Sequence, residues 1–274
     1  VIVGPYEHHS NEVSFREALC EIQRINLDKQ GLVDLNHLKL VLEENKHREI
    51  IASFCIASNV TGIITPYEEI SKMLRSYNAI VCFDAAASSP YINIPCHLYD
   101  AMFMSPHKLL GGPASCGLLI IRKSLVDTTI PPSFAGGGTV LYVNKTSQTY
   151  QKDLEAREEA GTPPILQFIR ASLAYQLRNE IGFEFIKKQK DELKEYFISE
   201  LKKIPNCEIY GNQEAPNIGI VSFNIKGLSP YDLCNRLSTE ASFQTRAGCS
   251  CAGPYGHDLL GIEKLDMTNR PGWV

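Results

Sequence analysis

The sequence has no long apolar run, no excess of basic charge and no regular cysteine pattern. No apolar run approaches the ~20 residues that a helix needs to cross a bilayer, and no charged-then-apolar leader indicates secretion. The formal net charge of −4 gives no positive field of the kind that attracts nucleic acid. We therefore expect neither a membrane nor a nucleic acid as a partner.

The nine cysteines are odd in number, and their spacings do not repeat. Four of them lie within apolar stretches and are expected to be small core residues: Cys55, Cys82, Cys116 and Cys207. No disulfide framework is expected, which indicates a reducing compartment inside the cell. The sequence therefore predicts a cytoplasmic protein.

The composition is typical of a globular protein with one large or two modest domains. The chain has 274 residues, of which 44% are hydrophobic and 21% charged. It starts at Val1 with a strand-like Val-Ile-Val and stops at Trp273-Val274, where another strand is expected to begin. We therefore interpret the chain as a fragment that is truncated at both ends.

Strand-like and helix-like segments alternate in the first 180 residues. Strands are expected at 21–27, 49–58, 79–83, 101–104 and 117–121. Helices are expected after Asp34, after Pro66 and at 164–178, and the first has an apolar side made of Leu38, Leu40, Val41 and Leu42. Near-continuous apolar runs are typical of strands covered on both faces. This order predicts an α/β fold with a mostly parallel sheet sandwiched by helices.

The pattern changes in the remaining part of the chain, residues 181–274. The elements expected there are a charged helix at 183–204, strands at 207–210 and 219–225, a helix beginning at Ser229-Pro230 and a strand at 243–246. This order predicts a smaller, incomplete α+β C-terminal domain after a large domain over 1–180.

Two charged residues follow neighbouring strand-like runs. Asp84 ends the run at 79–83, and Lys108 follows the run at 101–104, just before a glycine turn. Singly, each is more often a solvated surface residue. Together they suit a pyridoxal phosphate (PLP) enzyme, in which the lysine forms the Schiff base and the aspartate keeps the pyridine nitrogen protonated.

Six short motifs occur in one order along the chain. They are Glu7-His8-His9-Ser10-Asn11, Ser58-Asn59-Val60-Thr61-Gly62, Asp84-Ala85-Ala86, Ser105-Pro106-His107-Lys108, Gly136-Gly137-Gly138-Thr139 and Arg246-Ala247-Gly248-Cys249-Ser250-Cys251. With these motifs the chain resembles, over nearly its whole length, the class V aminotransferase family of fold-type I PLP enzymes, which includes the cysteine desulfurases.

The resemblance implies a set of PLP-binding residues. Lys108 would form the Schiff base from a buried position, and Asp84 would pair with the pyridinium nitrogen. Ala86 would pack on one face of the ring, because a small side chain lets the flat ring approach. His8 would stack on the opposite face and take part in catalysis. Asn59 would hydrogen-bond the ring oxygen or the substrate carboxylate.

The resemblance also implies residues for the phosphate and for an amino-acid substrate. Ser105 and His107 would bind the phosphate, since a hydroxyl and an imidazole suit an anion. Arg246 would grip the α-carboxylate of the substrate with its planar guanidinium. Thr139 would reach the phosphate of a partner subunit, which implies a homodimer with the site near the interface.

Several of these residues also have an ordinary structural interpretation. His8 could be a surface histidine at a strand end, and we interpret His9 as one. Asn59 and His107 could be turn residues. One departure from the family stands at Ala87, where desulfurases usually carry a glutamine, so the ring oxygen would lose a hydrogen-bond donor.

Cys251 follows Arg246 by five residues, on a loop expected to lead into a helix. In cysteine desulfurases a cysteine at this position attacks the sulfur of the PLP-bound substrate and becomes a persulfide. Cys249 could compete for this role. Two alternatives stay open: inert or redox-sensitive thiols, or metal ligands together with His257, although structural zinc usually has four ligands at wider spacing.

Three functions follow from these patterns. The first is a cysteine desulfurase-like C–S lyase that uses Lys108 and Cys251. The second is a class V aminotransferase or another PLP lyase in which Cys251 is a bystander. The third is a catalytically inactive fragment, because the helix N-terminus that helps to hold the phosphate in this family is expected upstream of His8.

Overall fold

The centre of the protein is a six-stranded sheet, seen in a computed structural model that describes residues 1–262. Along the sheet the strands are β2 (Gln23–Arg24), β1 (Ile2–Val3), β3 (Ile51–Cys55), β4 (Ile80–Asp84), β5 (Ala101–Met104) and β6 (Leu118–Ile121). All neighbouring pairs are parallel except β5 and β6, which are antiparallel. The predicted mostly parallel sheet is confirmed.

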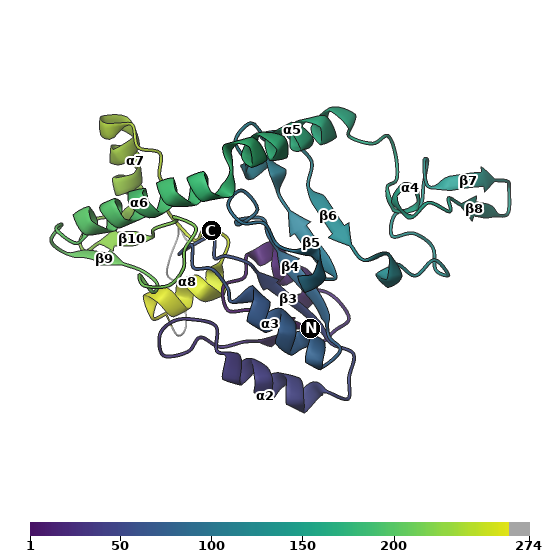
Figure 1. Ribbon diagram of the computed structural model, residues 1–274, viewed down its shortest axis with the longest axis horizontal. Helices are drawn as coiled ribbons and strands as arrows, with labels where there is room; N and C mark the ends of the chain where they lie inside the picture. The colour runs from purple at the N-terminus through teal and green to yellow at the C-terminus, as the bar shows by residue number, and fades with distance from the viewer. Residues whose placement is uncertain (263–274) are drawn as a thin grey trace, which may run out of the picture.

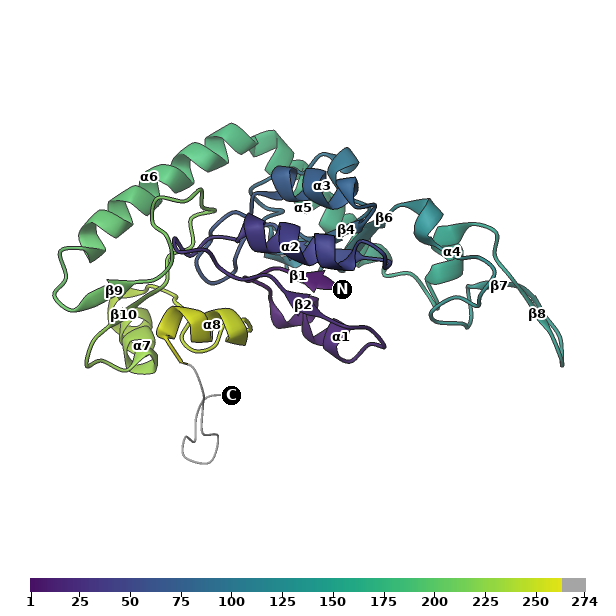
Figure 2. The ribbon, with the colours of Figure 1, turned by 90° about the horizontal axis from the view of Figure 1, so that it is seen from below.

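Helices cover the sheet on both sides (Figure 2). On one side lie α2 (Leu35–Asn45) and α3 (Tyr67–Ser76), and on the other side lie the short α1 (Val13–Arg16) and α8 (Gly253–Leu260). Apolar side chains of α2, α3 and α8 join the strands in one buried core, among them Leu38, Leu42, Ile70, Leu74 and Tyr255. Packing in this core fixes the position of the strands, and therefore the position of the residues that follow them.

The local sequence accounts for the start of α2. The Asp34 carboxylate accepts a hydrogen bond from His37 N at 2.9 Å and so caps the helix, as predicted. Leu40 was expected on the apolar side but is 61% exposed. Two residues along a helix span about 200°, so Leu40 points away from the face that carries Leu38 and Leu42.

The cysteine predictions are only half right. Cys55 and Cys82 are buried in β3 and β4, as expected of small core residues. Cys116 and Cys207 are only partly buried, because Cys116 lies two residues before the edge strand β6 and Cys207 is the first residue of a strand in a two-stranded hairpin.

A segment that the sequence did not predict projects from the sheet. This lateral extension, residues 126–163, contains the antiparallel hairpin of β7 (Val140–Val143) and β8 (Gln148–Tyr150) and the short helix α4 (Leu154–Glu158). Both views show it at the far end of the molecule from α7 and β9 (Figures 1 and 2). The buried Arg157 holds it together by binding Glu158 and the carbonyl of Ile130.

Two long helices follow the lateral extension: the first leads back to the sheet, and the second leads on to a further hairpin (Figure 1). These are α5 (Ile165–Ile181) and α6 (Phe183–Leu201), and Gly182 joins them with φ +86°, a left-handed conformation that suits glycine. The predicted domain boundary near residue 180 stays a prediction, and it falls beside this glycine. The hairpin of β9 (Cys207–Ile209) and β10 (Phe223–Ile225) and the helix α7 (Pro230–Ala241) follow.

One predicted strand was wrong. Residues 243–246 form no strand, because they lie against α7 rather than beside another strand. Phe243 N donates to Leu237 O at 2.9 Å, and Cys234 Sγ lies 3.1 Å from Thr245 O. The strand expected to begin at Trp273-Val274 falls outside the described residues. Within residues 1–262, no helix is both long enough and apolar enough to cross a bilayer.

Candidate active site

The carboxyl ends of β4 and β5 bring Asp84 and Lys108 to one edge of the sheet. Asp84 is the last residue of β4 and pairs with Phe103 of β5, and Lys108 ends the short 3-10 helix η3 (Pro106–Lys108) directly after β5. The carboxyl ends of neighbouring parallel strands meet at the same edge, where open α/β sheets bind their ligands. The two residues therefore lie at the same edge of the sheet, and their shared role in binding a cofactor stays a prediction.

Asp84 is a largely desolvated carboxylate. Burial raises its pKa, while the backbone N–H of Ala86 and the charges of Lys108 and His8 lower it. Ala86 N donates to Oδ1 at 2.8 Å. A cationic N–H at the second oxygen would stabilise the charged form further, because a desolvated carboxylate is stable only when it is paired.

His8 lies close enough to Asp84, Lys108 and Arg246 for their charges to act on its pKa. Burial is the largest effect and lowers the pKa of His8, which favours a neutral imidazole. Its Nδ1 accepts a hydrogen bond from Ser10 N at 3.1 Å, which fixes the ring as the N-cap of η1 (His9–Asn11). A neutral, oriented imidazole suits contact with another flat ring.

The side chain of Lys108 is exposed, as is that of His107, whereas Ser105 is partly buried. The expected burial of the lysine is therefore wrong for the described residues, because η3 is at the margin of the sheet and no described segment covers its amine. The glycine turn behind η3 is tight: a Cβ on Gly112 would lie 1.9 Å from Pro106 O.

Asn59 leaves β3 on a turn and reaches the C-terminal part of the chain. Its Nδ2 donates to Ser250 O at 2.6 Å, and its buried Oδ1 has no hydrogen-bond partner among the described residues. An amide nitrogen has two hydrogens, so one is left for a ligand oxygen. An unpaired buried oxygen at the site is a further group that a ligand could satisfy.

The loop that carries Cys251 meets the same edge. Arg246 Nη2 lies 3.8 Å from Cys251 Sγ, and the loop leads into α8 as expected. Ser250 and Cys251 both have a left-handed backbone, with φ of 52° and 56°. Cys249 is exposed and Cys251 partly buried.

His9 is a residue of the site that the sequence interpretation missed. Its main-chain N donates to Cys251 O at 2.7 Å, and its ring Nε2 accepts from Gly253 N at 2.8 Å. The interpretation of His9 as a surface histidine is therefore wrong. The only signal in the sequence is that it follows His8, since its partners lie more than 240 residues further along the chain.

Thr139 does not join this group in a single chain. It directly precedes β7 in the lateral extension, and both views show β7 away from β4 (Figures 1 and 2). Its side chain is fully buried, and its hydroxyl donates to Gly136 O at 2.8 Å within its own loop. Its predicted contact with the phosphate of a partner subunit stays a prediction.

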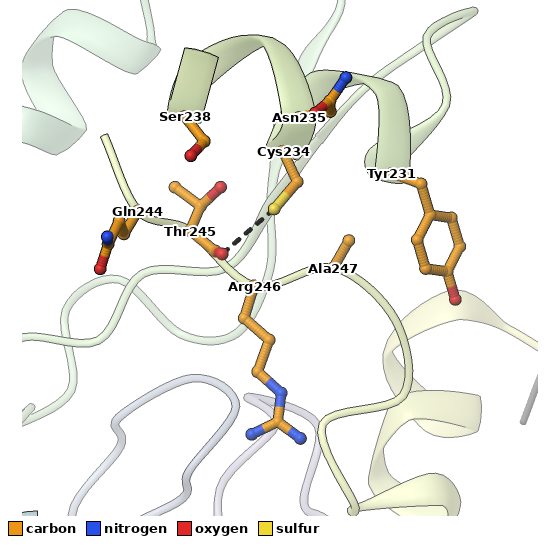
Figure 3. A pocket seen from close by; sticks show the side chains of 8 residues that line it. All are labelled: Tyr231, Cys234, Asn235, Ser238, Gln244, Thr245, Arg246 and Ala247. Atoms are coloured by element: carbon orange, nitrogen blue, oxygen red, sulfur yellow. Dashed lines mark hydrogen bonds between the residues drawn. The ribbon is translucent and has the colours of Figure 1, made fainter. Parts of the chain in front are cut away.

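A cavity of about 610 Å³ adjoins the site on the α7 side (Figure 3). It lies between α7 and residues 244–247, with Cys234 and Ser238 on its α7 wall. The guanidinium of Arg246 points away from α7, out of the space between the two segments (Figure 3). Among residues 1–262, no three His, Cys, Asp or Glu side chains gather as a metal ion would require.

A mostly parallel sheet with an aspartate and a lysine at its carboxyl edge defines the class of fold-type I PLP-dependent enzymes. Residues 1–266 match the family described as Aminotransferase class-V. The chain belongs to this family.

Curated relatives and solved structures carry the name of one branch of the family. A cysteine desulfurase from Haloferax volcanii is 30% identical over 268 residues, which are 96% of this chain and 61% of the relative. The apo structure of a cysteine desulfurase from Thermococcus onnurineus has a TM-score of 0.80 and 28% identity, over 95% of this chain and 65% of that one. A cysteine desulfurase from Escherichia coli has a TM-score of 0.84 and 25% identity, over 95% of this chain and 64% of that one. The chain thus spans less than two thirds of the length of these proteins.

Class V aminotransferases are PLP-dependent enzymes, and the residues at this edge fit the cofactor. Asp84 offers a desolvated carboxylate to a pyridinium nitrogen, and Asn59 offers an unsatisfied amide. Close to Asp84, His8 offers a flat ring and Ala86 a small side chain, both of which suit contact with a planar cofactor. Lys108 offers an exposed amine at the same edge.

Proposed function

We propose that the protein is a PLP-dependent, cysteine desulfurase-like C–S lyase that acts on a small amino acid. The observation that carries the proposal is the meeting of two groups at one edge of the sheet. The first group, with Asp84, His8 and Lys108, suits the cofactor, and the second, with Arg246 and Cys251, suits substrate and sulfur. The names of the relatives support the same activity.

In this proposal the cofactor is held by residues from several segments. Lys108 anchors it covalently as a Schiff-base lysine, Asp84 pairs with its ring nitrogen, and His8 and Ala86 enclose its ring. Ser105 and His107 lie on the η3 turn next to the lysine, where a hydroxyl and an imidazole would bind a phosphate. When bound, PLP supplies an electron sink for charge that develops on the substrate.

The substrate side of the proposal uses Arg246 and Cys251. Arg246 binds the α-carboxylate with its guanidinium. Cys251 Sγ attacks the sulfur of a substrate cysteine, so that an S–S bond forms while the bond between that sulfur and Cβ breaks. The electron pair of the broken bond stays with the carbon skeleton, which takes up one proton and leaves as alanine. The products are alanine and a persulfide on Cys251, and no external oxidant is needed.

We also propose that the active protein is a homodimer with its sites near the interface. Because Thr139 directly precedes β7, away from β4 and β5 (Figure 1), its contact with a phosphate would have to occur in the site of another copy. A row of exposed apolar residues on one side of α5 supports such an interface: Ile165, Ile169, Leu173, Leu177 and Ile181. This helix also touches the turn after Lys108, because Arg170 Nη1 donates to Pro113 O at 2.8 Å.

Purified full-length protein tests the function directly. We expect visible absorbance from bound PLP, its loss in Lys108→Ala, and equal amounts of alanine and protein persulfide after addition of cysteine. Peptide mass spectrometry should place the persulfide on Cys251, and Cys249→Ser should retain it while Cys251→Ser loses it. A colourless wild-type protein would instead favour the inactive alternative.

A second function has one observation in its favour. Ala87 stands where desulfurases usually carry a glutamine, and it is followed by the buried Ser88, whose hydroxyl has no partner among the described residues. The ring oxygen would therefore lack a donor from that position. A yellow protein that converts an amino donor to a keto acid, and forms no persulfide, would identify an aminotransferase with Cys251 as a bystander.

A further inference from the structure

The loop that carries the thiols is bound to the N-terminal half of the chain at three points. We call residues 249–253 the thiol loop. His9 N donates to Cys251 O at 2.7 Å, Gly253 N donates to His9 Nε2 at 2.8 Å, and Asn59 Nδ2 donates to Ser250 O at 2.6 Å. Two of the three bonds therefore come from one residue, His9, through its main chain and its ring.

The backbone of the thiol loop does not adopt its shape by local preference. Ser250 and Cys251 are consecutive non-glycine residues in the left-handed region, and such a conformation costs about 1–2 kcal/mol for each residue. A loop under this strain relaxes unless its surroundings hold it. The hydrogen bonds from His9 and Asn59 are the contacts at the loop backbone that oppose this relaxation.

The ring of His9 acts at a particular atom of the loop. Gly253 is the first residue of α8, where backbone N–H groups have no partner inside the helix. His9 Nε2 accepts this hydrogen bond, so a neutral His9 carries its hydrogen on Nδ1. The fit is close, since a Cβ on Gly253 would lie 3.1 Å from His9 Nε2.

His9 also follows the residue that faces Asp84. The ring of His8 is fixed by its bond to Ser10 N, and its neighbour His9 is fixed by the thiol loop. His8, which lies near Asp84, and His9, which is hydrogen-bonded to the backbone of Cys251, are therefore joined by a single peptide bond. A shift of His9 relative to the loop would change the separation between Cys251 Sγ and a substrate held at His8.

We propose that His9 is a positioning residue that clamps the thiol loop, so that Cys251 Sγ stays within reach of a substrate bound between His8 and Arg246. This inference rests on the proposed role of Cys251 as sulfur acceptor. His9 itself touches neither the substrate nor the cofactor.

The test uses two substitutions of similar size in the full-length protein. His9→Gln keeps an acceptor, Oε1, at about the position of Nε2, whereas His9→Leu fills the same space without an acceptor. His97→Ala is the control, because His97 is exposed in η2 (Cys96–Leu98), before the start of β5 and at the opposite end of this strand from Lys108. For each protein we would measure PLP absorbance, KM and kcat for persulfide formation, and the iodoacetamide alkylation rate of Cys251 relative to the exposed Cys20.

We expect His9→Leu to lower kcat about tenfold or more, with KM and PLP content unchanged, and to raise the relative alkylation rate of Cys251 severalfold. His9→Gln and His97→Ala should stay within about threefold of wild type in every measurement. Equal kcat and equal alkylation in wild type and His9→Leu would overturn the proposal, and so would a His9→Gln variant as defective as His9→Leu.

A measurement on the wild-type protein covers the case in which His9→Leu does not fold. The clamp predicts slow hydrogen exchange at Gly253 N–H, a position where a helix start normally exchanges fast. Fast exchange there would overturn the proposal. If wild type forms no persulfide, the proposed function fails, while alkylation and hydrogen exchange still decide whether His9 holds the loop.

Discussion

The Glu7 carboxyl group is among the most deeply buried polar groups of the protein, with 1% of its surface exposed. Cys55 N donates to both of its oxygens at 3.0 Å, and Asn11 Nδ2 donates to Oε2 at 2.5 Å. Asn11 Oδ1 in turn accepts from Ser53 Oγ at 2.6 Å. This buried network fastens the segment that carries His8 and His9 onto β3.

The pH dependence of stability should report on Glu7. Burial raises the pKa of Glu7 from 4.5 to about 8, against the lowering effect of its hydrogen bonds. Between these values the unfolded chain releases the proton and the folded protein keeps it. Stability from this group therefore falls as pH rises through the window, by about 1.4 kcal/mol for each pH unit.

The substitution Glu7→Gln removes this titration and keeps the shape of the side chain. Between pH 5.5 and 7.5 we expect the free energy of unfolding of the variant to rise relative to wild type by roughly 2–3 kcal/mol. Urea unfolding at the two pH values measures the difference, with Glu17→Gln as an exposed control. A constant difference between Glu7→Gln and wild type across this range would contradict the prediction.

At the scale of single elements, η3 depends on the glycine turn that follows Lys108. A Cβ on Gly112 would lie 1.9 Å from Pro106 O, and backbone atoms cannot yield as a flexible side chain can. Gly112→Ala should therefore displace η3, lower the free energy of unfolding by about 3 kcal/mol and reduce the PLP absorbance of the full-length protein.

The neighbouring Gly111 provides the matched control. It has φ +77°, and no atom outside Gly111 and its two chain neighbours lies within 4 Å of the position of a Cβ. Gly111→Ala should lower the free energy of unfolding by only about 1–2 kcal/mol, the cost of an alanine in the left-handed conformation. PLP binding should be unchanged. Thermal unfolding and PLP absorbance would be measured for both variants. Equal losses of stability and absorbance in the two would contradict the prediction.

The sequence predicted those elements whose signals are local. The cap at Asp34, the proline before α3 and the apolar runs of β3, β4 and β5 are such signals, and the structure confirms these elements. The hairpin β7–β8 was missed because its strands are short and largely exposed. The strand expected at 243–246 was wrong because a strand also needs a neighbour, and α7 occupies that place.

The same limit applies to the site. Asp84 and Lys108 could be paired from sequence because parallel neighbouring strands end at the same edge. The hydrogen bonds from Asn59 and His9 to the thiol loop join residues that lie 191 and 244 positions apart. No local pattern encodes such contacts, so they become visible only when the chain is folded. The exposure of Lys108 likewise depends on what covers η3, which no motif specifies.

At the scale of the whole molecule, the apolar side of α5 should determine assembly. Ile169 and Leu173 are 51% and 59% exposed in the single chain. If a second copy covers them, replacing both by lysine should convert the dimer to a monomer, because burying two charges without partners is strongly unfavourable. Light scattering after size-exclusion chromatography would measure the mass.

The control for this experiment is Leu193→Lys on α6, which is 64% exposed and lies outside the row on α5. It should leave the mass unchanged. A wild-type protein with the mass of one chain, or a doubly substituted protein that stays dimeric, would rule out α5 as the interface.

The left-handed backbone at Cys251 also bears on attempts to engineer this protein. Glycine adopts that conformation without strain, so a redesign guided by stability alone would favour replacing the cysteine. Such a variant would be more stable to heat, but under the proposed function it would lose the thiol that accepts sulfur. Thermal stability and the proposed activity therefore make opposite demands on position 251. A more thermostable form should be sought by changing other residues.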